Sequence, residues 1–337
     1  MKYVLLLLTG WLLTGNTVCA GEQEIQACMR KLLFDVEDNV TVGELRRTCR
    51  KRTPVMLGLS KDHRKKSAPG ALRKRVLNED KTVLQPFTLM AHKPSYLLFA
   101  AYNDSGYLAS ELEGVAESTT ISLDNIEAQF QLSIKFPLMV ELFDGTADIF
   151  AAYTNRSFWQ VYNEDLSSPF RETNHEPEIW LQFHPNWELF GFTNTWNSIG
   201  INHQSNGRGG ALSRSWNRAF AWLTFQRGNL ALSIKPWIRI PEDKDRDDNP
   251  DITRYLGHCQ LGATYLWRRN VFSLMTRNNL ESGFSRGAIE ISWSFPFWKW
   301  PYLRGYIQYF NGYGESLLDY DEHINRIGVG VSLIDWL

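Results

Sequence analysis

Over most of the chain, hydrophobic and polar residues alternate with a period of two. In the segment 230–240, for example, Ile234 and Ile238 fall on one face, whereas Lys235 and Arg239 fall on the other. Successive side chains of a β-strand point to opposite faces, so the pattern predicts strands with one apolar and one polar face. A half-buried sandwich strand also alternates. Many segments here reach ten or more residues, however, and this length favours the strands of a membrane barrel.

About twelve such segments can be counted, and an even number suits a closed antiparallel barrel. Polar side chains can largely fill the interior of a barrel of this size, so a wide solute channel is not expected. We therefore predict an all-β fold, a twelve-stranded antiparallel transmembrane β-barrel over residues 87–337, with an N-terminal periplasmic extension. The expected strands cover residues 89–103, 125–139, 146–161, 177–190, 192–205, 214–226, 229–240, 254–267, 269–278, 285–297, 302–314 and 323–336.

The N-terminus has the pattern of a secretory signal peptide over residues 1–20. Lys2 supplies the positive charge, an apolar core follows, and Val18-Cys19-Ala20 forms a small-residue cleavage site. The apolar run is too short for a spanning helix, which needs about 20 residues. Export agrees with an outer-membrane barrel, as does the aromatic content of 13 Trp, 13 Tyr and 19 Phe. A secreted β-sandwich shares this composition, so composition alone leaves both folds open.

The composition changes near residue 86. Residues 21–85 hold 15 Lys and Arg against 9 Asp and Glu, in short basic runs such as Arg73-Lys74-Arg75. Such runs can touch anionic lipid or partners on the peptidoglycan side, but a solvated tail is the more common case. We expect a basic periplasmic segment over 21–86, with a short helix within 25–36. Because the chain is exported, we expect no nucleic acid among its partners.

The mature chain keeps three cysteines. Cys28 and Cys49 could form a disulfide in the oxidising periplasm or remain two buried thiols, and the compartment favours the disulfide. Cys259 is expected to pack on a strand. The sequence has neither a Cys-x-x-Cys motif nor clustered Cys and His residues, so we predict no zinc site.

The main candidate for chemistry lies at the end of one predicted strand and the start of the next. His203 and Ser205 share a face, so the imidazole could take the hydroxyl proton. Asn206-Gly207 begins a turn, and the returning strand can bring Asn217 beside His203, where its carbonyl could hold one tautomer. These are a nucleophile, a base and an orienting residue. The spacing by itself is weak evidence for a catalytic site, because His-x-Ser is common by chance.

Several blocks in the same order along the chain carry a more specific resemblance: residues 129–137, 167–174, 203–217, 248–253 and 312–317. From about residue 87 to the C-terminus, the chain resembles outer membrane phospholipase A, a calcium-dependent acyl hydrolase of Gram-negative bacteria. The resemblance implies a twelve-stranded barrel in the outer membrane. It also implies an enzyme of the phospholipase A1/A2 and lysophospholipase type that acts on phospholipids and lysophospholipids as a homodimer.

The resemblance also implies roles for the residues of the candidate site. Ser205 is implied to be the nucleophile, His203 the general base and acid, and Asn217 the residue that orients His203. In the family these side chains lie on the outer barrel wall, near the outer-leaflet headgroups. An asparagine in place of an aspartate stabilises an imidazolium less, but it still controls the tautomer.

A calcium ion is implied by the same resemblance. Its ligands would be the backbone carbonyls of Arg208 and Ser213, with the side chain of Ser167 donated by the second subunit. Calcium suits such oxygen ligands. Two residues depart from the family pattern: Gly210 replaces an aspartate often present, which makes a second calcium site doubtful, and Asn155 replaces a glutamine often found at the dimer interface.

Two other functions remain open from the residues alone. The barrel could transport or bind small hydrophobic molecules without catalysis, or it could be a structural barrel tethered through its basic segment. Neither function needs the set of Ser205, His203 and Asn217, so its presence favours the hydrolase.

Overall fold

The structure, a computed structural model, describes residues 29, 42–52, 70–83, 88–107, 123–185, 187–243, 245, 247–279, 282–300 and 302–334. It divides into two compact units, Met1–Ser67 and Ala68–Leu337. In the first unit, helix α2 spans Val42–Arg52. Cys49 on this helix is fully buried and disulfide-bonded. Cys28, the signal peptide and most of the helix expected within 25–36 lie outside the described residues, so the pairing of Cys28 with Cys49 stays a prediction.

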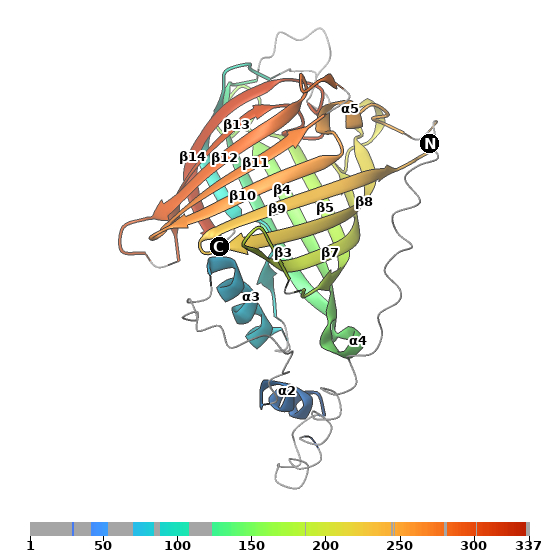
Figure 1. Ribbon diagram of the computed structural model, residues 1–337. Coiled ribbons are helices and arrows are strands. Elements are labelled where there is room, and N and C mark those ends of the chain that lie inside the picture. The colour runs from blue at the N-terminus through green and yellow to red at the C-terminus, as the bar shows by residue number, and fades with distance from the viewer. Residues whose placement is uncertain are drawn as a thin grey trace. The chain divides into compact units, whose positions relative to one another are not determined.

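Twelve long strands of the second unit form a closed antiparallel barrel (Figure 1). The ring closes because β2 pairs with β14 on one side and with β3 on the other. The predicted fold class is therefore confirmed. The barrel strands are β2 Ser95–Asn103, β3 Ile126–Glu141, β4 Ala147–Trp159, β5 Phe170–Phe183, β7 Phe192–Ser205, β8 Ser215–Arg227, β9 Leu230–Ile240, β10 Cys259–Trp267, β11 Asn270–Asn278, β12 Gly287–Pro296, β13 Arg304–Gly312 and β14 Ile324–Ile334.

Short elements sit at the ends of the barrel strands. Two two-residue strands extend the sheet, β1 beside β3 and β6 beside β7. None of the helices among the described residues is long and apolar enough to cross a membrane. The short elements are α3 Ala71–Thr82, β1 Met90–Ala91, α4 Leu142–Gly145, β6 Glu188–Leu189, the 3-10 helix η2 Gly210–Leu212 and α5 Thr253–Leu256.

Three predicted strand boundaries were wrong. The barrel strand expected at 89–103 begins at Ser95, after the two-residue strand β1. Strand β5 covers Phe170–Phe183 rather than 177–190, because its first half carries polar residues on both faces and shows no apolar alternation. The strand expected at 254–267 begins at Cys259, because Thr253–Leu256 forms the helical turn α5 with Leu256 buried inside. Gly257 then ends this turn with a φ of 67°, a conformation that glycine adopts without strain.

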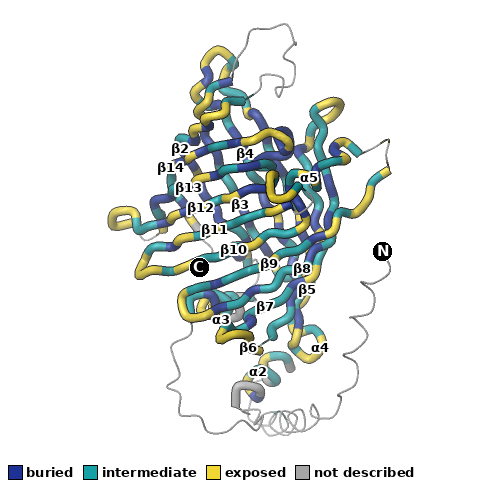
Figure 2. Tube along the Cα trace, turned by 45° about the horizontal axis from the view of Figure 1, so that its top comes forward, coloured by how far each residue is buried: buried dark blue, intermediate teal, exposed yellow. Residues whose placement is uncertain are grey.

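The two faces of the barrel wall differ as the alternation predicts (Figure 2). In β9, Ile234 and Ile238 are exposed on the outside, 37% and 69% respectively. Lys235 and Trp237 of the same strand line an interior cavity of about 230 Å³. The outer wall thus carries an apolar surface suited to lipid, and the interior carries polar side chains.

Ion pairs cross the interior of the barrel. Glu178 of β5 accepts from Lys235 of β9 at 2.8 Å, and its other oxygen lies 3.1 Å from the ammonium of Lys93. Glu176 pairs with Lys93 at 2.6 Å and with Arg218 of β8 at 3.1 Å. Because each buried charge has a partner of opposite sign, these pairs fill the lumen without an uncompensated charge.

Helix α3 belongs to the second compact unit, which begins at Ala68. Leu72 is 3% exposed and lines the interior cavity. Gln226 of β8 accepts from the backbone N–H of Arg73 at 2.9 Å, which satisfies one of the free donors at the start of the helix. Arg75 donates to the carbonyl of Ala91 at 2.7 Å. The basic run at 73–75, expected in a solvated segment, therefore packs against the barrel.

We predict that acid weakens the docking of α3. Burial alone would raise the pKa of Glu79, but Lys135 at 2.8 Å and Arg75 at 2.9 Å outweigh it and hold that pKa below its ordinary value of 4.5. A carboxyl whose pKa is lower in the folded state stabilises that state above its unfolded pKa, and the stabilisation is lost as pH falls through the folded value. Protease cleavage of α3 should therefore accelerate as pH falls below 4.5.

The Glu79→Gln variant should lose this part of the pH dependence, whereas Glu322→Gln, at an exposed loop residue, should behave like the wild type. An unchanged pH profile of cleavage in Glu79→Gln would show that Glu79 does not hold the helix.

Candidate functional site

The hairpin of β7 and β8 brings two of the predicted site residues into direct contact. His203 lies opposite Asn217 in the β7–β8 ladder, and its Nδ1 is 2.9 Å from the Asn217 Oδ1. Because a carbonyl oxygen only accepts, the imidazole donates through Nδ1 and keeps Nε2 as an acceptor. The contact thus gives His203 the tautomer that a general base needs.

Both residues face outward, because their neighbours face the lumen. Asn202 is 4% exposed and accepts from Arg218 inside the barrel at 2.9 Å. Gln204 accepts from the indole N–H of Trp216 at 3.0 Å. Since the side chains of a strand alternate, His203 lies on the outer wall near the end of β7.

Ser205 shares the outward face with His203, two residues further along β7. It lies opposite Ser215 of β8 and His175 of β5. Its hydroxyl makes no side-chain hydrogen bond within the described residues. Catalytic hydrogen bonds are often long before substrate binds, so the hydroxyl can still serve as a nucleophile whose proton passes to His203.

The sequence prediction missed two polar side chains beside this site. Nδ1 of His175 is hydrogen-bonded to the hydroxyl of Tyr153 at 2.6 Å. Glu242, which follows β9, accepts from Nδ2 of Asn217 at 2.9 Å. A correct start for β5 would have put His175 next to Ser205. No local pattern could have found Glu242, because its contact spans 25 residues.

The loop between β7 and β8 is shaped by Asn206. This residue is 5% exposed. Its side chain donates to the carbonyl of Leu212 at 2.8 Å and accepts from the backbone N–H groups of Arg208 at 3.3 Å and Arg214 at 3.0 Å. One buried amide therefore holds both halves of the loop. Gly207 takes a left-handed φ of 67° in the turn.

The carbonyls expected to bind calcium belong to this loop. The hydroxyl of Ser213 donates to the carboxylate of Asp248 at 2.5 Å, which adds negative charge beside the loop. The guanidinium of Arg214 donates to the carbonyl of Ser213 at 2.7 Å and must turn away before that carbonyl can bind a cation. Ser167 lies in the separate loop between β4 and β5, with φ of 58°. This set of oxygen donors fits a hard cation such as calcium.

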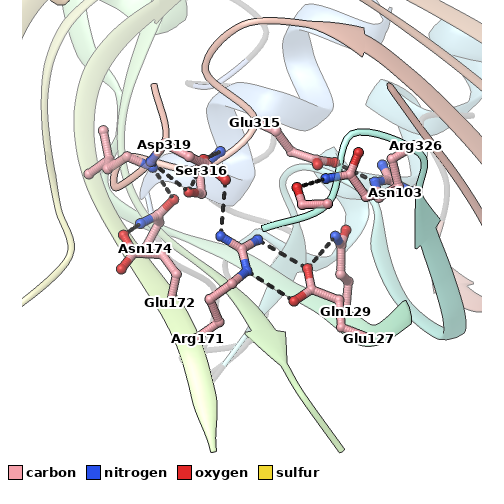
Figure 3. A network of polar contacts seen from close by, with 12 residues as sticks. Asn103, Glu127, Gln129, Arg171, Glu172, Asn174, Glu315, Ser316, Asp319 and Arg326 are labelled. Atoms are coloured by element: carbon pink, nitrogen blue, oxygen red, sulfur yellow. Dashed lines mark hydrogen bonds and ion pairs between the residues drawn. The ribbon is translucent and has the colours of Figure 1, made fainter. Parts of the chain in front are cut away.

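A buried polar network surrounds Arg171 (Figure 3). Arg171, at the start of β5, is fully buried. It donates to Glu127 of β3 at 3.0 and 3.1 Å, and to Asp319, which follows β13, at 3.0 Å. Arg208 donates to the backbone carbonyl of Arg171 and lies 3.4 Å from a carboxylate oxygen of Glu172. The network therefore connects distant strands with the loop that follows Ser205.

Comparisons with known proteins point to one family. The phospholipase A1 family matches residues 72–333, a range that begins within α3 and not at residue 87. A phospholipase A1 of Klebsiella pneumoniae is 35% identical over 296 residues, which are 88% of this chain and 99% of that protein.

Solved structures show the same fold. The outer membrane phospholipase of Salmonella typhi, a dimer with bound calcium, gives a TM-score of 0.70 at 36% identity, covering 80% of this chain and 100% of that one. The outer membrane phospholipase A of Escherichia coli is similar at a TM-score of 0.68 and 36% identity, covering 75% of this chain and 95% of that one. That structure is an active-site mutant in which an asparagine is replaced by alanine.

We predict that Arg171→Met strongly destabilises the barrel. The substitution leaves the carboxylates of Glu127 and Asp319 buried with their shared cation removed. Losing one partner of a buried ion pair costs about 3–5 kcal/mol, so the free energy of unfolding in a urea titration in lipid vesicles should fall by that amount. Arg269→Met, on the exposed turn between β10 and β11, is the control and should change it by less than about 0.5 kcal/mol. A loss below about 1 kcal/mol for Arg171→Met would contradict the role given to this network.

Proposed function

This chain belongs to the phospholipase A1 family, and we propose that it hydrolyses acyl esters of phospholipids with Ser205, His203 and Asn217. The observation that carries this proposal is the hydrogen bond of 2.9 Å between His203 and Asn217 on the outer wall. It leaves Nε2 of His203 free to accept a proton on the face shared with Ser205. The asparagine at the active site of the Escherichia coli relative supports the same role for Asn217.

The first half of the reaction forms an acyl-enzyme. His203 takes the proton of the Ser205 hydroxyl while its oxygen attacks the ester carbonyl carbon. The bond between that carbon and the glycerol oxygen then breaks, and His203 gives the proton to the departing oxygen. Asn217 keeps the imidazole in place throughout.

The second half regenerates the enzyme. His203 takes a proton from water as the water oxygen attacks the acyl carbon, and then returns this proton to the oxygen of Ser205. A fatty acid is released. A lysophospholipid carries the same kind of ester, so the same residues serve both substrates.

The position of the site suits a substrate held in a membrane. The protein is a barrel of the outer membrane, and its outer wall is apolar below the site. Ile201 precedes His203 on the same face and is 53% exposed. A phospholipid in contact with this wall can bring its ester to Ser205 without leaving the bilayer. Ion pairs that cross the lumen give no support to the alternative of a transport barrel.

We extend the proposal to calcium and a homodimer, since the outer membrane phospholipase of Salmonella typhi is a dimer with bound calcium. The carbonyls of Arg208 and Ser213 would hold the ion together with the side chain of Ser167 from the second subunit. Bound there, calcium would stabilise negative charge on the ester oxygen. Asn155, which replaces a glutamine often found at the dimer interface of the family, faces outward beside His175. It accepts a hydrogen bond from the hydroxyl of Ser157 at 3.1 Å.

We predict that Ser205→Ala lowers fatty-acid release by at least about a thousandfold, because the nucleophile is removed. The measurement is release of fatty acid from phospholipid by detergent-solubilised protein. Ser198→Ala, on the same strand but with the serine facing the lumen, should retain wild-type activity. Full activity in Ser205→Ala would refute the mechanism.

We predict that Ser167→Ala raises the calcium concentration for half-maximal activity by about tenfold, because one oxygen ligand is lost. This concentration is measured by titrating the activity with calcium, and a chelator gives the activity without calcium. Ser168→Ala is the control, because that hydroxyl donates within its own loop to Val161 at 3.1 Å. An unchanged calcium titration in Ser167→Ala would remove this serine from the ligand set, and activity in the chelator would remove calcium from the mechanism.

A further inference from the structure

The contacts of Asn217 continue beyond His203. Its Oδ1 is 2.9 Å from Nδ1 of His203, and its Nδ2 donates to Oε1 of Glu242 at 2.9 Å. Glu242 lies two residues after the end of β9, in the loop that leads to α5, and is half-buried. The amide of Asn217 therefore bridges an imidazole and a carboxylate.

Glu242 determines which way this amide points. An asparagine has a donor at one end and an acceptor at the other, so by itself it can face His203 in either orientation. A carboxylate only accepts, and it therefore requires the NH₂ end of Asn217. The carbonyl end must then face His203, the ring must donate from Nδ1, and Nε2 is left as the acceptor. The tautomer of His203 thus follows from the carboxylate of Glu242.

Glu242 also supplies a charge that Asn217 lacks. An imidazolium forms when His203 takes the proton of the nucleophile, and a nearby negative charge stabilises it. Within the described residues Glu242 forms no ion pair with a Lys or Arg. A carboxylate that accepts from Nδ2 also polarises the amide and strengthens the bond between its oxygen and the imidazole.

We propose that Glu242 is a positioning residue of the hydrolytic site: it fixes the amide of Asn217 and thereby the base form of His203. This inference rests on the proposed function and adds a fourth residue to it. Glu242 touches neither substrate nor the reacting atoms, and it acts through Asn217.

Single substitutions test the effect on turnover. Glu242→Ala should lower kcat about tenfold and leave KM within twofold. Glu242→Gln should fall between this variant and the wild type, because a glutamine keeps an acceptor but also offers a donor and has no charge. Asp243→Ala is the matched control, since this exposed neighbour makes no hydrogen bond or ion pair within the described residues. An unchanged kcat in Glu242→Ala overturns the proposal.

Moving the negative charge from position 242 to position 217 tests whether Glu242 positions Asn217 or only supports its own loop. Asn217→Asp places a second carboxylate beside that of Glu242, and the two repel each other. This variant should lower kcat at least tenfold. Adding Glu242→Gln to it turns position 242 into a donor toward the new carboxylate and should recover most of the loss. If Glu242 merely anchored its loop, the two substitutions would lower kcat further together than singly, and this result would overturn the proposal.

A readout without turnover keeps this inference distinct from the proposed function. The ¹⁵N chemical shifts of the His203 ring report which nitrogen carries the proton. We expect a single form protonated at Nδ1 in the wild type and a mixture in Glu242→Ala. The same single form in both proteins overturns the role of Glu242. If the tautomer shifts as expected but the wild type releases no fatty acid, the proposed function fails and the positioning stands.

Discussion

Closure of the sheet is the constraint on which the rest of this structure depends. In lipid no water can satisfy a backbone N–H or C=O group, so every strand needs a partner on both sides. The pairing of β2 with both β14 and β3 removes the last free edges. Once the ring is closed, each side chain faces either lipid or lumen, and each strand must alternate accordingly.

The same constraint decides how polar groups are placed on each face. Inside, charges are neutralised across the lumen, as between Glu178 and Lys235. Outside, polar side chains near the site pair with one another across strands, as Tyr153 does with His175. The candidate site is therefore a small polar area at the end of an apolar wall, built from cross-strand pairs.

The sequence predicts the parts of this structure that depend on period two. The strand count and the common face of His203 and Ser205 follow from alternation, and the pairing of His203 with Asn217 follows from the turn between them. Helix α3 was not predicted, because its basic run resembles a solvated segment. Its docking on the barrel depends on partners far along the chain, such as Lys135. Ser167, Arg208 and Ser213 remain only predicted as calcium ligands. The family resemblance implies this role, whereas the contacts of these residues do not indicate it.

The position of the negative charge at the proposed site follows from the surroundings of the outer wall. A carboxylate at position 217 would lie on a wall beside lipid, where an ionised group is costly to desolvate. A neutral amide at Asn217 avoids that cost but brings neither charge nor a preferred orientation. Glu242 stands beyond the end of β9, in a loop outside the wall, where water can solvate a carboxylate. In the proposed arrangement the negative charge of Glu242 therefore remains where water solvates it. The amide of Asn217, hydrogen-bonded to both residues, transmits the influence of this charge to His203.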